Sequence, residues 1–163
     1  MTMVVLTNPL SASARAATAE ETAYRIDYPL AFARSTRVIA FDASAAQTVA
    51  SVAESDWGQA QFYIASASGD ELVTLSGEPC VMTAEIEHSD SVIFVATDAV
   101  DSDAVASVGA ACRERSIMTA GLLLLNEGPL SGATLAAIRP YARVLLVPAH
   151  EDDLFELLTA IRA

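Results

Sequence analysis

Short apolar runs alternate with segments of helical periodicity from Arg37 to the end of the chain. The runs contain few polar interruptions, which is typical of parallel strands that are buried on both faces of a sheet. The strands predicted from them are residues 37–42, 60–67, 91–98, 117–126 and 143–149. Alternation of strands with helices indicates βαβ units. We therefore predict an α/β fold, a three-layer Rossmann-like sandwich with a mostly parallel sheet of about five or six strands.

Three helices have recognisable signals. Ser44 and Gln47 have the spacing of a capping box, so a helix is expected to begin at Ser44, directly after the first strand. The helix after residue 98 is expected to bury the stripe Ala104, Val105, Val108, Ala111 and Cys112, and residues 152–163 carry Leu154, Leu157, Leu158 and Ile161 at i, i+3, i+4, i+7 spacing. Residues 71–88 fit either a short helix or an irregular edge.

Length favours one α/β domain over all 163 residues, enough to bury a core. Residues 1–36 form a possible amino-terminal extension with a short strand and an alanine-rich helix. Whether this extension completes the chain's own sheet or packs against a neighbour stays open at this level.

Composition excludes several function classes. The net charge is −12, and all nine basic residues are arginines. The absence of lysine removes a P-loop lysine and a Schiff-base lysine, while the acidic balance argues against nucleic acid and against anionic membrane surfaces. No apolar run approaches the roughly 18 residues that span a membrane, and the first residues lack the pattern of a signal peptide, so we expect a cytoplasmic protein.

Cysteine and histidine spacing gives no support for a zinc site. Cys80 and Cys112 form no CxxC pair, and His88 and His150 are isolated from them. Cys112 belongs to the apolar stripe of its helix and is expected in the core. A role for Cys80 as a nucleophile, or for His150 as an acid–base group, stays open.

Candidate ligand-binding residues gather where the predicted strands end. In open parallel sheets, ligands bind outside the carboxyl ends of the strands. The residues expected there are Asp42, Ser44, Thr97, Asp98, Asp101, Asp103, Asn126 and His150. Two interpretations compete for the aspartates. They could hold Mg²⁺, which prefers oxygen ligands, or Asp101 or Asp103 could cap the following helix, which is the interpretation we favour.

The segments SDSVIFVATD, ACRERSIMTAGLLLL and IRPYARVLLVPAHEDDLFELL resemble the nucleotide-binding half of the FtsZ/tubulin superfamily over about residues 89–158. The turn Val147-Pro148-Ala149 is similar to its IPN turn. The superfamily's glycine-rich phosphate loop would fall on Asp98–Ala104, which contain no glycine. The resemblance therefore implies the fold but no binding or hydrolysis of GTP, and it carries over no functional residue.

A second likeness is to receiver domains, through FDAS, ATD and LLVPAHEDDLFELLTAIRA, with Asp98 at the acceptor position. The acidic pair and the lysine of receiver chemistry have no counterpart here, so this likeness implies at most a pseudo-receiver.

These observations favour a non-catalytic α/β binding or regulatory module, a homodimer or other homo-oligomer, with a small molecule or a protein as partner. The alternative is a small Mg²⁺-dependent enzyme that uses the acidic carboxyl edge of the sheet, with His150 as acid–base group.

Overall fold

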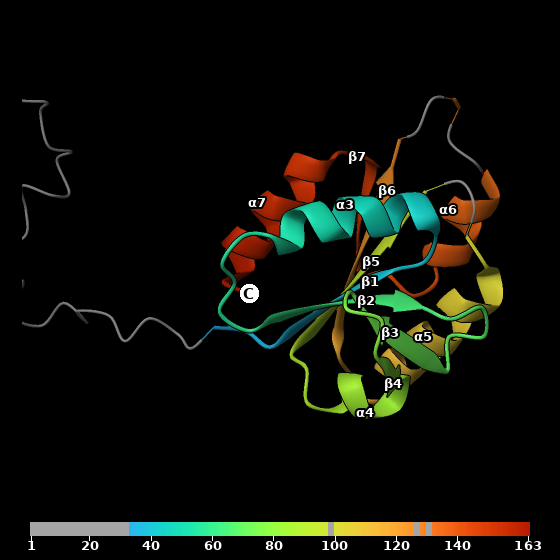
Figure 1. Ribbon diagram of the computed structural model, residues 1–163. Helices are drawn as coiled ribbons and strands as arrows, with labels where there is room; N and C mark the ends of the chain where they lie inside the picture. Colours follow the sequence, from blue (N-terminus) through green and yellow to red (C-terminus); the bar gives the residue numbers. More distant parts are fainter. Residues whose placement is uncertain (1–32, 98–99, 126–127, 130–131) are drawn as a thin grey trace, which may run out of the picture. The chain divides into compact units, whose positions relative to one another are not determined.

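A computed structural model describes residues 33–97, 100–125, 128–129 and 132–163. Residues 33–163 form one compact unit (Figure 1). The predicted amino-terminal extension lies almost wholly outside the described residues.

The elements follow the predicted alternation, with a hairpin inserted after the second strand. Their order is β1 (Thr36–Ala40), α3 (Ala43–Ala53), β2 (Ala60–Ala65), β3 (Glu71–Thr74), β4 (Pro79–Val81), α4 (Met82–Glu87), β5 (Ser91–Ala96), α5 (Ser102–Glu114), β6 (Met118–Leu124), α6 (Gly132–Ile138), β7 (Val144–Ala149) and α7 (Glu151–Ile161).

In the described part of the chain, seven strands form one sheet in the order β4-β3-β2-β1-β5-β6-β7. β2, β1, β5, β6 and β7 are parallel, whereas β3 and β4 are antiparallel additions beyond β2. The predicted α/β architecture is confirmed. The sheet is wider than expected because residues 71–88, ambiguous in sequence, form β3, β4 and the short helix α4.

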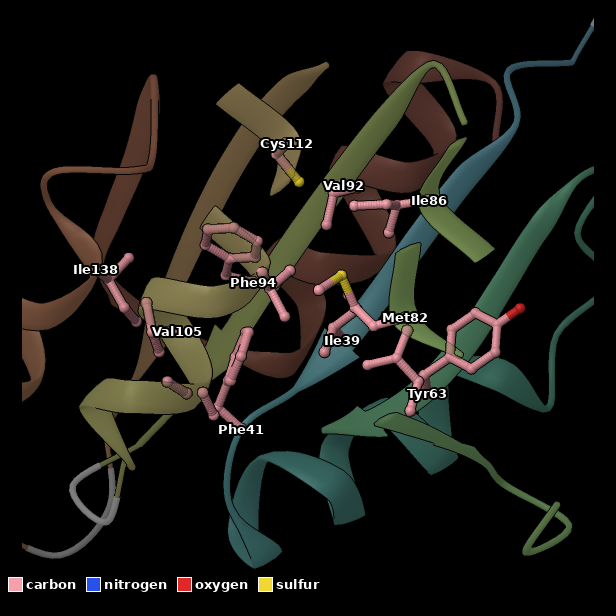
Figure 2. Packing of buried hydrophobic residues seen from close by; sticks show 14 of the residues in the cluster. Ile39, Phe41, Tyr63, Met82, Ile86, Val92, Phe94, Val105, Cys112 and Ile138 are labelled. Atoms are coloured by element: carbon pink, nitrogen blue, oxygen red, sulfur yellow. The ribbon is translucent and has the colours of Figure 1, made fainter. Parts of the chain in front are cut away.

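Two apolar layers lie on opposite faces of the sheet. α3 and α7 cover one face, where Val49, Leu154 and Leu158 pack on the sheet (Figure 1). On the other face, α4, α5 and α6 pack around Phe94, whose ring meets Phe41 edge-on (Figure 2). Every residue of β1 and of β5 is buried, which explains the apolar runs Val38–Ala40 and Val92–Ala96 within them.

The predicted helical stripes are largely correct. All five apolar positions expected on α5, Cys112 included, are buried. On α7, Leu154 and Leu158 are buried, while Leu157 and Ile161 are partly buried and pack against the same layer.

The predicted capping box at Ser44 is wrong. Helix α3 begins at Ala43, and its N-cap is Asp42, whose side chain accepts a hydrogen bond from the backbone N–H of Ala45. Ser44 is therefore inside the first turn, where its side chain is exposed. Aspartate is as good a cap as serine, so the capping function moves two residues upstream.

Candidate functional site

The carboxyl edge of the sheet, where β1, β5, β6 and β7 end, contains Asp42 and Thr97 in direct contact. Asp42 Oδ2 accepts from the backbone N–H of Thr97 at 2.6 Å, and Asp42 Oδ1 accepts from the Thr97 hydroxyl at 2.7 Å. Asp42 Oδ1 also accepts from Ala45 N at 2.8 Å. Asp42 is only 9% exposed. Its carboxylate joins the end of β5 to the start of α3 and is committed to holding the fold.

The other described candidates at this edge are helix-terminal residues. Asp101 is the N-cap of α5 and accepts from the backbone N–H of Asp103 at 2.9 Å. His150 is the N-cap of α7, and its backbone N–H donates to Asp153 Oδ2 at 2.7 Å. The favoured cap interpretation of Asp101 is confirmed. Asp98 and Asn126 lie outside the described residues.

Within the described ranges, no three histidine, cysteine or acidic side chains form a group able to hold a metal ion. Three of the about four lone-pair sites of the Asp42 carboxylate already accept hydrogen bonds from Thr97 and Ala45. Among the described residues of the predicted set, the structure pairs Asp42 with Thr97 and Asp101 with Asp103, and each pair serves local structure.

The opposite edge of the sheet, where β6 and β7 begin, contains a pocket that we call the arginine pocket. Its volume is about 220 Å³. It lies between the carboxyl end of α5 and the chain that enters β6 and β7. The lining residues are Gly109, Arg113, Ser116, Ile117, Thr119, Pro140, Tyr141, Ala142 and Arg143.

One wall of the arginine pocket is built from the ring of Tyr141 lying against α5. A Cβ on Gly109 would approach the Tyr141 ring to 2.3 Å, so only glycine allows this contact. Arg113 lies one turn further along α5. Its guanidinium stacks over the same ring at 5.2 Å from the centroid, and Nη2 donates to Pro140 O at 2.9 Å. Glycine in a helix costs about 1 kcal/mol relative to alanine, and this close approach gives the residue a packing role.

Thr119 fixes the opposite wall. Its hydroxyl donates to Tyr141 O at 2.5 Å, and the backbone N–H of Arg143 donates to Thr119 O at 3.1 Å. Thr119 is buried, so these bonds are shielded from water. The segment from Tyr141 to Arg143 is therefore tied to β6, and both arginines start from fixed backbone positions.

The charge of the arginine pocket is positive. Its described lining has two arginines and no carboxylate, although the whole chain carries −12. In the described part of the chain, the Arg113 side chain uses one of its five N–H donors, and the Arg143 side chain contacts only Met118 Sδ, at 3.8 Å. Guanidinium groups with free donors bind carboxylate or phosphate in a bidentate manner. The pocket can accept an oxyanion.

A second hollow, between β2 and the β3–β4 turn, has no free polar group of comparable kind. Tyr63 donates to Glu85 at 2.5 Å there, and burial raises the pKa of the Tyr63 hydroxyl. Cys80 lies in β4 and also lines this hollow. Burial and the nearby Glu85, Glu78 and Glu71 raise the pKa of its thiol. A raised pKa disfavours the reactive thiolate, so Cys80 is a poor nucleophile.

The sequence did not predict the arginine pocket, because the rule for open parallel sheets favours their carboxyl edge. One signal was present. Four of the nine arginines lie between residues 113 and 143, in a chain with an excess of acids. The pairing of Gly109 with Tyr141 had no sequence signal, because the two residues meet only through packing of α5 on the 139–143 turn.

No protein-family model matches this chain, and no match was found among curated proteins. Among the described residues, none of the helices has the length and apolar character needed to cross a membrane.

Proposed function

We propose that the protein is a non-catalytic binding module that takes an oxyanion in the arginine pocket. One observation carries the proposal. Two arginines with uncommitted donors line a preformed pocket that contains no acidic side chain among its described residues.

Capping is the simplest competing role for Arg113. It lies in the last turn of α5, where a cation interacts favourably with the helix dipole, and it donates to the carbonyl of Pro140. That role explains one donor of Arg113. It does not explain Arg143, which precedes β7 and has no helix end to cap.

The pocket is small for an organic ligand. Sites for drug-sized molecules occupy about 300–1,000 Å³, compared with about 220 Å³ here. A free phosphate, a small carboxylic acid or one acidic side chain of a partner fits this size. The oxyanion is the shared chemistry of these ligands.

Thermal unfolding of the full chain in inorganic phosphate, with sodium chloride at matched ionic strength as the reference, tests the proposal. Phosphate bound only by the folded state raises Tm by mass action, whereas general salt effects appear in both series. Arg113→Gln and Arg143→Gln should each weaken binding about 10- to 100-fold, since one charge-assisted hydrogen bond contributes about 1.5–3 kcal/mol.

Arg139→Gln is the matched control, because Arg139 is exposed and close in sequence but does not line the pocket. Equal phosphate and chloride effects, or equal loss in Arg139→Gln, would overturn the proposal.

The homodimer expected from the sequence is retained as part of the proposal, as is the cytoplasmic location. β7 lies at the end of the sheet order, so its outer edge pairs with no other strand of the described residues. The backbone of an unpaired outer strand is a surface on which a second copy can pair. Sedimentation velocity gives the oligomeric state directly, and a strict monomer at all accessible concentrations would remove the dimer.

A further inference from the structure

A small apolar groove adjoins the arginine pocket at the same edge of the sheet. It has a volume of about 120 Å³ and is lined by residues of β5, β6, β7 and α7, including Met118, Val144 and Leu157. Thr119 lines both the groove and the arginine pocket. The arginine pocket lies on the α5 face of the sheet and the groove on the α7 face, and the two meet at the edge where β6 and β7 begin, where Arg143 contacts Met118.

Strand alternation explains why a charged hollow and an apolar one meet here. Successive side chains of a strand point to opposite faces. Arg143 lines the arginine pocket and Val144 lines the groove, while Met118 lines the groove and Thr119 reaches both. The Arg143 guanidinium touches Met118 Sδ at 3.8 Å. The apolar and cationic groups thus lie side by side.

Met118 and Val144 are 47% and 52% exposed. Isolated exposed apolar residues are ordinary. These two, however, stand at the starts of neighbouring strands, beside an arginine with free donors. A free inorganic anion would contact the arginines and leave both apolar side chains in water, so it would use only half of this surface.

We propose that the occupant is a segment of a partner protein in which an acidic side chain is followed by apolar side chains. Its carboxylate binds Arg113 and Arg143, and its apolar side chains cover Met118 and Val144. Charge complementarity selects this partner. The inference rests on the proposed oxyanion site and names the source of the oxyanion.

Fluorescence anisotropy of the full chain with two labelled, capped heptapeptides tests the inference. One peptide has a central Glu-Leu-Leu, and the other has Glu-Ser-Ser. We expect the Glu-Leu-Leu peptide to bind about tenfold more tightly, because only its side chains bury apolar surface. Val144→Thr should reduce that advantage and leave the phosphate response unchanged, because Val144 lines the groove and not the arginine pocket. Leu75→Thr changes an exposed leucine that lines neither the groove nor the arginine pocket, so it should not change the binding of either peptide.

The outcomes separate this inference from the proposed function. Equal binding of both peptides, with the phosphate response intact, overturns the acidic–apolar partner and leaves the oxyanion site standing. If neither phosphate nor either peptide binds, both the oxyanion site and the acidic–apolar partner are overturned. A dimer that Val144→Thr dissociates would show that a second copy occupies the groove, which also overturns the inference.

Discussion

The two edges of the parallel sheet use their charged residues in opposite ways. At the carboxyl edge, the carboxylate of Asp42 is buried and accepts three hydrogen bonds from Thr97 and Ala45. At the amino edge, Arg113 and Arg143 are exposed and keep most of their donors free within the described part of the chain. A charged residue at a strand end is therefore a candidate for binding only when the fold has not already used it.

Replacing Asp42 should have the largest effect on stability. Asp42→Ala removes the cap of α3 and leaves the buried backbone N–H of Thr97 without its acceptor. Loss of a cap costs about 1 kcal/mol and an unsatisfied buried donor about 1–3 kcal/mol. We expect the free energy of unfolding to fall by about 2–4 kcal/mol in urea denaturation.

Asp42→Asn keeps one acceptor oxygen, so its free energy of unfolding should fall by less than that of Asp42→Ala. If Asp42→Ala were as stable as the original protein, the carboxylate would not be structural, and the carboxyl edge would return as the candidate site.

Replacing Gly109 tests whether the amino edge is preformed. In Gly109→Ala the new Cβ meets the Tyr141 ring, so the ring must move and Arg113 loses its platform. We expect a loss of about 1–3 kcal/mol from overpacking, together with weaker phosphate binding in thermal unfolding. Gly132→Ala is the matched control. A Cβ there meets nothing within 4 Å, so that variant should be neutral or slightly stabilised.

The pH dependence of stability tests whether the thiol of Cys112 is buried in the core between the two edges. Burial raises its pKa to about 12, compared with about 8.5 for a free thiol. Because the unfolded chain loses this proton first, the stabilising contribution is complete below pH of about 8.5. It falls as the pH rises toward 12, by about 1.4 kcal/mol per pH unit.

Urea denaturation of Cys112→Ala should therefore show a flatter alkaline pH dependence than the original chain, from a lower starting stability. Identical slopes in the two proteins would contradict burial of this thiol.

Magnesium should have the smallest effect. Since the Asp42 carboxylate is committed to Thr97 and Ala45, millimolar MgCl₂ should change Tm by less than about 1 °C beyond an equal ionic strength of sodium chloride. A larger rise that Asp98→Asn abolishes would restore the magnesium-dependent alternative at the carboxyl edge.

The sequence predicted the architecture well where apolar patterns were strong. β1, β5 and the stripe of α5 were recognisable, because burial on both faces of a strand leaves an apolar run and burial of one helical face leaves a period of 3.6 residues. The elements within residues 71–88 could not be recognised in the sequence. β3, β4 and α4 are short and lie at the end of the sheet, where tertiary pairing outweighs local preference.

The residues predicted from the sequence lie at the carboxyl edge, whereas the site that we propose lies at the amino edge, and the difference has a physical reason. The rule for open parallel sheets identified Asp42 and Thr97 as neighbours, and they are. It could not show that the two residues would satisfy each other. The arginine pocket depends on Tyr141 crossing Gly109 and on Thr119 holding the chain before β7. These contacts join residues at least 20 positions apart, without a repeated spacing.

The most direct test of whether the amino edge or the carboxyl edge binds an oxyanion is an inorganic phosphate titration of the ¹⁵N-labelled full chain, followed by NMR. The account predicts that amide shifts concentrate at Ser116, Ile117 and Tyr141–Arg143, and that Arg143→Gln abolishes them while Arg139→Gln does not. Shifts concentrated instead at Ser44, Thr97 and Asp101, on the carboxyl edge, would contradict it.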